Sequence, residues 1–300
     1  IVPRKDTDCV KYDNVKEIFG TDDIIPMWVA DMDWKTPPFI IDAIHKQLDH
    51  GVLGYSICSS RWKPAIQSWV SRHYDWKVEP EEIAFVGGIV PAIAFAMQCF
   101  TKAGDKVLIQ PPVYHPYHNV TIELGRTLVT NPLKLVNGQL EIDFEDFEEK
   151  VKECKLFLLC NPHNPCGRVW SKEELLSMCD ICVKNNVLVI SDEIHCDMAL
   201  KGYRHTPFAT VSEEAKNNCI TFMAASKTFN IAGLKSSYHI IQNEEIRNHY
   251  NEFLRKSELD SAHLFATLPV AAAYDNGDEW LEQMLEYVDA NIDYMEEYLK

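Results

Sequence analysis

The sequence lacks the features that mark nucleic-acid-binding and membrane-spanning proteins. Its 29 Lys and Arg residues are outnumbered by 45 Asp and Glu residues, which leaves a formal net charge of −16. Nucleic-acid binding requires a basic face, so this balance argues against it. No apolar run approaches the roughly 20 residues of a membrane-spanning helix, and no secretory signal is visible. We therefore expect neither nucleic-acid nor membrane partners.

Repeats and low-complexity segments are also absent, and the ten cysteines are scattered. Disulfide frameworks belong mainly to small secreted domains, so these cysteines indicate reduced thiols and a cytoplasmic location. Cys179 and Cys182 form a C-x-x-C pair, but no second pair follows at zinc spacing. Because the pair falls in an expected helix, a buried helix face is favoured over a zinc or redox site.

From about residue 80, short apolar runs alternate with helical patterns. The expected strands are 83–86, 107–110, 127–130, 156–160, 187–191, 220–224 and 238–242. The expected helices between them are 91–100, 114–124, 144–152 and 171–185. Unbroken apolar strands separated by helices are typical of a mostly parallel sheet covered on both faces. We therefore expect an α/β fold with a seven-stranded sheet sandwiched by helices.

The two ends of the chain differ from this alternating pattern. Residues 1–45 precede it and are expected to form an N-terminal segment belonging to a smaller domain. Residues 46–276 are expected to form the large domain. Residues 277–300 carry apolar residues at helical spacing and are expected to be a connecting helix. Because the chain begins with Ile1 and ends within this helical pattern, the second domain is expected to be only partly present.

Five expected strands end in glycine, proline or polar residues, and ligands bind parallel sheets at the carboxyl ends of their strands. These ends are Gly87-Gly88, Pro111–Tyr114, Asn161–Pro165, Asp192–His195 and Ser226-Lys227. In Asn161–Pro165 two prolines fix the backbone and so aim the asparagine side chains. Gly87 and Gly88 would let a phosphate approach N–H groups at a helix N-terminus, although many ordinary strand-to-helix turns contain glycine. Together these ends predict a site.

Asp192 closes a buried strand, where a carboxylate is costly unless a cation pairs with it. A pyridinium nitrogen would be such a partner. The alternatives are an ordinary structural aspartate and a metal cluster with Glu193, His195 and Asp197, although neighbouring strand residues point to opposite faces. Lys227 follows an apolar strand, and lysine is rarely buried. Alone it suggests an exposed loop lysine, but beside Asp192 we expect a desolvated nucleophile able to form an imine.

The succession N-P-H-N-P-C-G, S-D-E-I-H-C-D and A-S-K-T-F-N-I-A-G-L resembles the fold-type-I aminotransferases that use pyridoxal 5'-phosphate (PLP). Asn164 and Asp192 are 28 residues apart, and Asp192 and Lys227 are 35 apart, close to the family pattern. Stretches 28–38, 54–56 and 111–114 are similar to the MalY/PatB branch, the cystathionine β-lyase-like C–S lyases. The resemblance extends over essentially the whole chain and implies the type I PLP-dependent transferase fold.

The resemblance implies a role for each motif residue. Lys227 would hold PLP as an imine, and Asp192 would pair with the pyridinium nitrogen and keep the ring an electron sink. Asn164 would bind the ring 3-oxygen, and Tyr114 would stack on the ring. His195 stands where many relatives have a tyrosine that serves the same oxygen. The phosphate would contact the N–H groups of Ile89 and Val90, the Ser226 hydroxyl, Lys235, and Tyr55 from the partner subunit of a dimer.

The resemblance also implies that Ala30, Asp31, Tyr55 and Asn164 face the amino-acid substrate, with no metal. Two departures from the family pattern stand out. Many relatives have an arginine phosphate clamp at the position of Lys235, and lysine neutralises phosphate only as a point charge. The arginine that binds the substrate carboxylate in the family lies in the C-terminal part of the small domain, beyond residue 300.

The expected activity is β-elimination from a cysteine S-conjugate such as cystathionine, which yields a thiol, pyruvate and ammonia. Transamination on the same site is the alternative, because both reactions begin with removal of the Cα proton. A further alternative is a PLP-fold regulator that binds a transcription factor, a side role that relatives of this branch can have. Intact Lys227, Asp192 and Asn164 argue against a loss of catalysis. The resemblance implies a homodimer with shared active sites.

Overall fold

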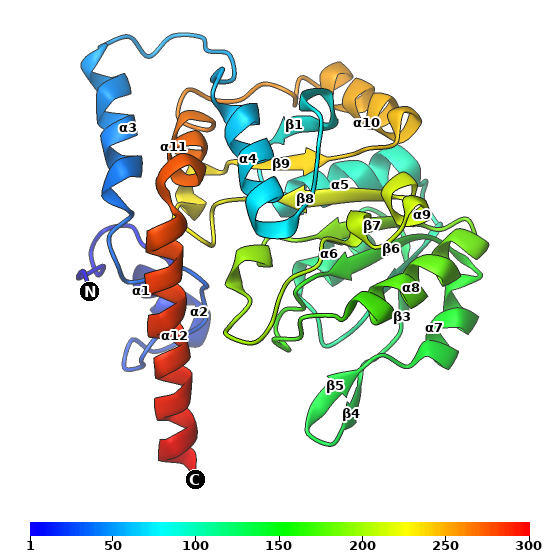
Figure 1. The fold of residues 1–300 in the computed structure, drawn as a ribbon. Helices are drawn as coiled ribbons and strands as arrows, with labels where there is room; N and C mark the ends of the chain where they lie inside the picture. The colour runs from blue at the N-terminus through cyan, green and yellow to red at the C-terminus, as the bar shows by residue number, and fades with distance from the viewer.

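A seven-stranded sheet forms the centre of the computed structural model, which describes residues 1–300 (Figure 1). Its strands are β1 (Ile83–Val86), β2 (Lys106–Ile109), β3 (Thr127–Thr130), β6 (Cys154–Cys160), β7 (Leu188–Asp192), β8 (Cys219–Met223) and β9 (Ser237–Ile240). They lie in the order β1-β9-β8-β7-β6-β2-β3, and only β9 runs against its neighbours. The predicted fold class and all seven predicted strands are confirmed.

A separate two-stranded hairpin, β4 (Lys134–Val136) and β5 (Gln139–Glu141), protrudes from the body of the molecule (Figure 1). The sequence pattern did not predict it. Asn137 and Gly138 form its turn with φ of 50° and 83°, the left-handed conformation that two-residue hairpin turns of type I′ require.

Helices cover both faces of the sheet. The helices of the whole chain are α1 (Val10–Asp13), α2 (Val15–Phe19), α3 (Pro38–Asp49), α4 (Trp62–Tyr74), α5 (Ile89–Phe100), α6 (Pro116–Glu123), α7 (Phe144–Val151), α8 (Lys172–Lys184), α9 (Glu213–Asn217), α10 (Glu244–Lys256), α11 (Leu268–Asn276) and α12 (Asp278–Leu299). The predicted helices correspond to α5, α6, α7, α8 and α12. Helices α5, α6 and α10 bury one face, whereas α4, α7, α8 and α11 bury the other.

The β6 strand explains why the sequence showed unbroken apolar runs. Leu156 and Leu158 contribute to the core beneath α5 and α6, whereas Phe157 and Leu159 contribute to the core beneath α7 and α8. Successive side chains of a strand point to opposite faces, so a strand covered on both faces must be apolar at every position. Burial of each such side chain contributes roughly 1.5–3 kcal/mol.

The buried C-x-x-C pair lies on α8. Cys179 and Cys182 are both buried in the core beneath that helix, and all ten cysteines are free thiols. The prediction of a buried helix face is therefore confirmed.

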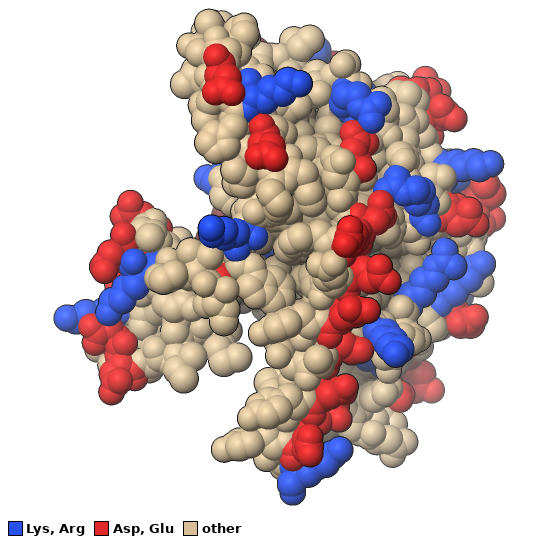
Figure 2. Space-filling view, turned by 60° about the vertical axis from the view of Figure 1, so that its left-hand side comes forward, with Lys and Arg blue, Asp and Glu red and all other residues tan.

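The N-terminal segment lies beside α12, away from the sheet (Figure 1). The Trp34 ring packs edge-on against Trp280 and Tyr287 of α12, with ring centroids 6.5 and 5.0 Å away. Figure 2 shows a line of acidic side chains along α12 toward the end of the chain, as expected from the surplus of acid. None of the helices combines the length and the apolar character needed to cross a membrane.

Candidate active site

The carboxyl ends of β6, β7 and β8 bring the predicted site residues to one edge of the sheet. Asn164 lies in the loop after β6, Asp192 is the last residue of β7, and Lys227 follows β8 by four residues. The strands are parallel neighbours, with Cys160 opposite Asp192 and Asp192 opposite Phe222. Residues that are 28 and 35 positions apart in the sequence therefore meet at the same edge.

Asp192 is a buried carboxylate with two neutral hydrogen-bond donors. Its side chain accepts the Ile194 backbone N–H at 3.1 Å and the Tyr117 hydroxyl at 2.8 Å. Burial raises the pKa of Asp192 to about 6, and these two hydrogen bonds act against that rise. The carboxylate is thus mostly ionised at neutral pH without a cation bonded to it, as a site for a positively charged ligand group would be.

Lys227 lies in a partly buried position on the other side of this edge. Its Nζ donates a hydrogen bond to the Ala30 carbonyl at 3.2 Å. Burial lowers the pKa of Lys227, and the negative charges of Asp31 and Asp192 oppose the shift. Because a lowered pKa increases the fraction of uncharged amine, Lys227 has the character of a nucleophile and a base.

A cavity of about 360 Å³ adjoins Lys227. Its walls include Ala30, Asp31, Trp34, His195, Met198 and Lys227. Burial lowers the pKa of His195 to about 4, so this ring is neutral at physiological pH. The structure therefore places Ala30 and Asp31, which were expected to face the substrate, beside Lys227 and His195, which were expected to bind the cofactor. Tyr55 and Asn164, the other two residues expected to face the substrate, do not line this cavity.

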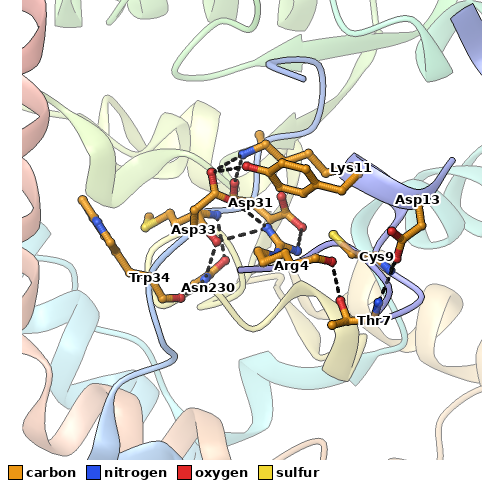
Figure 3. A network of polar contacts seen from close by, with 12 residues as sticks. Arg4, Thr7, Cys9, Lys11, Asp13, Asp31, Asp33, Trp34 and Asn230 are labelled. Carbon is orange, nitrogen blue, oxygen red and sulfur yellow. Dashed lines mark hydrogen bonds and ion pairs between the residues drawn. The ribbon is translucent and has the colours of Figure 1, made fainter. Parts of the chain in front are cut away.

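Arg4, Lys11 and Asn230 fix one wall of this cavity (Figure 3). Arg4 pairs with Asp31 at 2.6 Å and with Asp33 at 3.2 Å. Lys11 pairs with Asp33 at 3.1 Å. These contacts hold the segment that follows Ala30 against the rest of the N-terminal region.

The Asn230 side chain joins the same wall to the loop that carries Lys227 (Figure 3). Its amide accepts the Met32 N–H at 2.9 Å and donates to the Met32 and Trp34 carbonyls, both at 3.0 Å. Asn230 lies within the A-S-K-T-F-N-I-A-G-L stretch, but that pattern predicted no role for it. Its place three residues after Lys227 was the available signal.

The buried Asp197 carboxylate also holds the loop that carries Lys227. Asp197 accepts hydrogen bonds from Thr228 at 2.7 Å, from the Trp69 indole at 2.9 Å and from the Tyr74 hydroxyl. Glu193 pairs with His205 at 2.8 Å. Asp192, Glu193, His195 and Asp197 therefore have separate partners and do not come together as a group that could hold a metal ion.

The remaining predicted residues lie around the edge at different depths. Tyr114 is 37% exposed, and burial together with the nearby Asp192 charge raises its pKa. Ser226 is buried, and the backbone N–H of Asn164 donates to the Cys160 thiol at 3.3 Å. Lys235 is exposed. The Tyr55 side chain is fully exposed and does not line the cavity of its own chain.

Comparison with known proteins identifies the family. The model of the family "Aminotransferase class I and II" matches residues 23–300. The chain belongs to the class I and II aminotransferase family. Cystathionine beta-lyase PatB of Bacillus subtilis (strain 168) is 43% identical over 298 residues, which cover 99% of this chain and 77% of that protein. Protein MalY of Escherichia coli (strain K12) is 33% identical over 303 residues, covering 98% and 76%.

Among solved structures, the PLP-bound C–S lyase from Staphylococcus hominis superposes with a TM-score of 0.93 at 36% identity, and the match covers 100% of this chain and 75% of that one. Within the class I and II aminotransferases, this chain therefore lies in the MalY/PatB branch, which confirms the resemblance.

The site has the groups that a class I and II aminotransferase needs for PLP. Lys227 supplies an amine of lowered pKa, and Asp192 a buried carboxylate without a bonded cation. Helix α5 follows β1 and begins at the same edge of the sheet, no side chain caps its N-terminus, and its first N–H groups belong to Ile89 and Val90. Gly88 precedes this helix with φ of 134°, a conformation that L side chains rarely adopt. The residues present thus fit the cofactor.

Proposed function

We propose that this chain is a PLP-dependent C–S lyase that eliminates a thiol from cysteine S-conjugates such as cystathionine, leaving pyruvate and ammonia. The observation that carries the proposal is the placement of Lys227 and Asp192 at one edge of the sheet, where Lys227 lines the cavity, in a chain 43% identical to a cystathionine beta-lyase. PLP is the cofactor, as in the PLP-bound C–S lyase of Staphylococcus hominis.

When bound, PLP supplies a covalent attachment for the substrate amine and an electron sink for the electrons left at Cα. Lys227 accepts the Cα proton at Nζ, a role favoured by burial, which lowers its pKa and increases the fraction of uncharged amine. Its hydrogen bond to Ala30 holds Nζ at the wall of the cavity. Asp192 remains charged near neutral pH and balances a positive ring nitrogen. Asn164 and Tyr114 would complete the contacts to the ring.

The decisive experiment is incubation of the full-length protein with cystathionine, followed by assays for pyruvate and free thiol. Lyase activity releases both in equal amounts, and a Lys227→Ala variant releases neither. Transamination would instead consume an added 2-oxo acid without releasing thiol. A regulator without catalysis would bind PLP but leave cystathionine intact. Either of the last two results would contradict the proposal.

We also propose that the active protein is a homodimer in which Tyr55 reaches the phosphate of the neighbouring subunit. The support is an irregular segment in which Val52, Leu53, Tyr55 and Ile57 are all exposed. Contiguous exposed apolar side chains of this kind mark interaction surfaces.

Subunit exchange tests this arrangement. When Tyr55→Phe and Lys227→Ala proteins are mixed, each heterodimer has one site without either lesion, so activity should rise above that of both parents. No rise despite verified exchange would place Tyr55 in the site of its own subunit.

The domain division and the cellular location remain proposals of the same kind. We propose residues 46–276 as the large PLP-binding domain, 1–45 as part of the small domain and 277–300 as the connection between them. We propose a cytoplasmic location, which the ten free thiols support. Limited proteolysis and cell fractionation test these two statements.

A further inference from the structure

Tyr117 is the one side chain that donates a hydrogen bond to the Asp192 carboxylate. Its hydroxyl lies 2.8 Å from Oδ2, and the backbone N–H of Ile194 lies 3.1 Å from Oδ1. The two donors come from different elements, α6 and the loop after β7. Each carboxylate oxygen therefore has one fixed donor and retains a lone pair for a further group, because a carboxylate offers about four acceptor positions.

The phenol of Tyr117 is held so that it cannot turn away from Asp192. Its side chain is 1% exposed and belongs to the core beneath α5 and α6. The Tyr114 ring packs edge-on against it, with centroids 6.1 Å apart. Burial and the nearby Asp192 charge raise the pKa of Tyr117 well above its ordinary value, so the hydroxyl keeps its proton. It is thus a permanent donor over the working pH range.

The other groups around Asp192 do less to favour its charged form. The titratable groups that face it are Tyr114 and Tyr117 from α6 and the turn before it, Cys160 from β6, Lys227 from the loop after β8, and Glu193, which follows it in the chain. Burial raises the pKa of Asp192, and the Tyr117 hydrogen bond is the strongest influence that lowers it. The attraction of Lys227, the only cation in this set, is smaller.

We propose that Tyr117 is a positioning residue whose hydroxyl holds the Asp192 carboxylate in one orientation and in its charged form, ready to pair with the ring nitrogen of the cofactor. This inference rests on the proposed function for the identity of that nitrogen. The hydrogen bond itself acts on the carboxylate before any ligand binds. Without the hydroxyl, a buried carboxylate with a single donor takes up a proton at higher pH and then cannot balance a positive ring.

A Tyr117→Phe variant of the full-length protein tests the inference, with Tyr274→Phe as the matched control. Tyr274 is also buried, and its hydroxyl contacts Tyr238 at 2.9 Å in the other core. Infrared titration of the cofactor-free protein follows protonation of the Asp192 carboxyl group, and an Asp192→Asn variant identifies its band. We expect the midpoint to rise by about one to two pH units in Tyr117→Phe and to stay unchanged in Tyr274→Phe.

The holoenzyme provides a second measurement. The acid limb of the pH profile of kcat should shift to higher pH in Tyr117→Phe. KM on the alkaline plateau should stay near the wild-type value. If Tyr117→Phe does not fold, 3-fluorotyrosine at position 117 replaces it. Its more acidic phenol donates more strongly and should lower the Asp192 midpoint.

An unchanged Asp192 midpoint in the variant that folds would overturn the inference, even in an active lyase. A shifted midpoint in a protein that neither binds PLP nor cleaves cystathionine would sink the proposed function and leave the role of Tyr117 intact. The two failures are therefore distinguishable.

Discussion

Replacing Asp192 with asparagine should stabilise the cofactor-free protein at neutral pH although it removes the charge that activity requires. Burial raises the pKa of Asp192 from 3.8 to about 6. A group with a raised pKa in the folded state contributes stability that is fully present below pH 3.8 and is lost as the pH rises through about 6. A rise of this size corresponds to roughly 3 kcal/mol. Asparagine never ionises, so the variant avoids this loss.

The geometry allows asparagine to keep both hydrogen bonds. Its amide oxygen accepts the Ile194 N–H, and its NH₂ donates to the Tyr117 hydroxyl, which can accept as well as donate. The free energy of unfolding, measured in urea at intervals from pH 4 to 8, isolates the ionisation. The difference between variant and wild type should grow by roughly 2.5 kcal/mol across this range and level off above about pH 7.

The matched control is Asp180→Asn, the same chemical change on the exposed side of α8. Because the change expected for Asp192→Asn depends on burial, this exposed substitution should not reproduce it. Parallel curves for wild type and Asp192→Asn would show that no ionisation penalty is stored at Asp192. The electrostatic description of the site would then be wrong.

Three further predictions concern the Lys227 loop. Borohydride should bleach the absorption band of the yellow holoenzyme, and mass spectrometry should find the reduced adduct on Lys227; an adduct on another lysine would refute its role. Asn230→Ala loses three hydrogen bonds to the cavity wall and should raise KM for cystathionine about tenfold with PLP content preserved, so an unaltered KM would contradict that role. Thr228→Val leaves the buried Asp197 with one donor fewer and should cost about 1–3 kcal/mol of stability in calorimetry, whereas no loss would mean that the bond is not needed.

The sheet could be predicted because its strands have a strong local signature. A run such as Leu156–Cys160 is apolar at every position. Between two helices, such a run is typical of a strand in a parallel sheet that is covered on both faces. Helix α6 begins at Pro116, two residues later than predicted, because proline is suited to the first turn of a helix. The β4–β5 hairpin was missed because its residues are mostly exposed and carry no apolar pattern. Its Asn-Gly turn was the only local signal.

Apart from Ala30 and Asp31, which the family resemblance pointed to, the site could be predicted only where its residues follow strands. Asp192 and Lys227 were found because each closes an apolar run. Tyr117 was missed because its hydrogen bond to Asp192 joins residues 75 positions apart, although its spacing of one helical turn from Tyr114 was visible. The pairing of Arg4 with Asp31 likewise depends on the course of the irregular N-terminal segment, which brings the two residues together. No periodic pattern in the sequence predicts the course of an irregular segment.

The hydrogen bonds between Asn230 and Met32 have a consequence for synthesis on the ribosome. The two residues are 198 positions apart, so at 5–20 residues per second Met32 waits roughly 10–40 s for its partner. The β1 strand waits too, because its only neighbour in the sheet is β9. During this interval the N-terminal segment has been synthesised, but the residues against which it packs have not. Trp34 belongs to this segment and packs on α12 only later. Chaperones that bind emerging apolar segments would meet this part of the chain first, and they would have to release it after residue 230 has emerged.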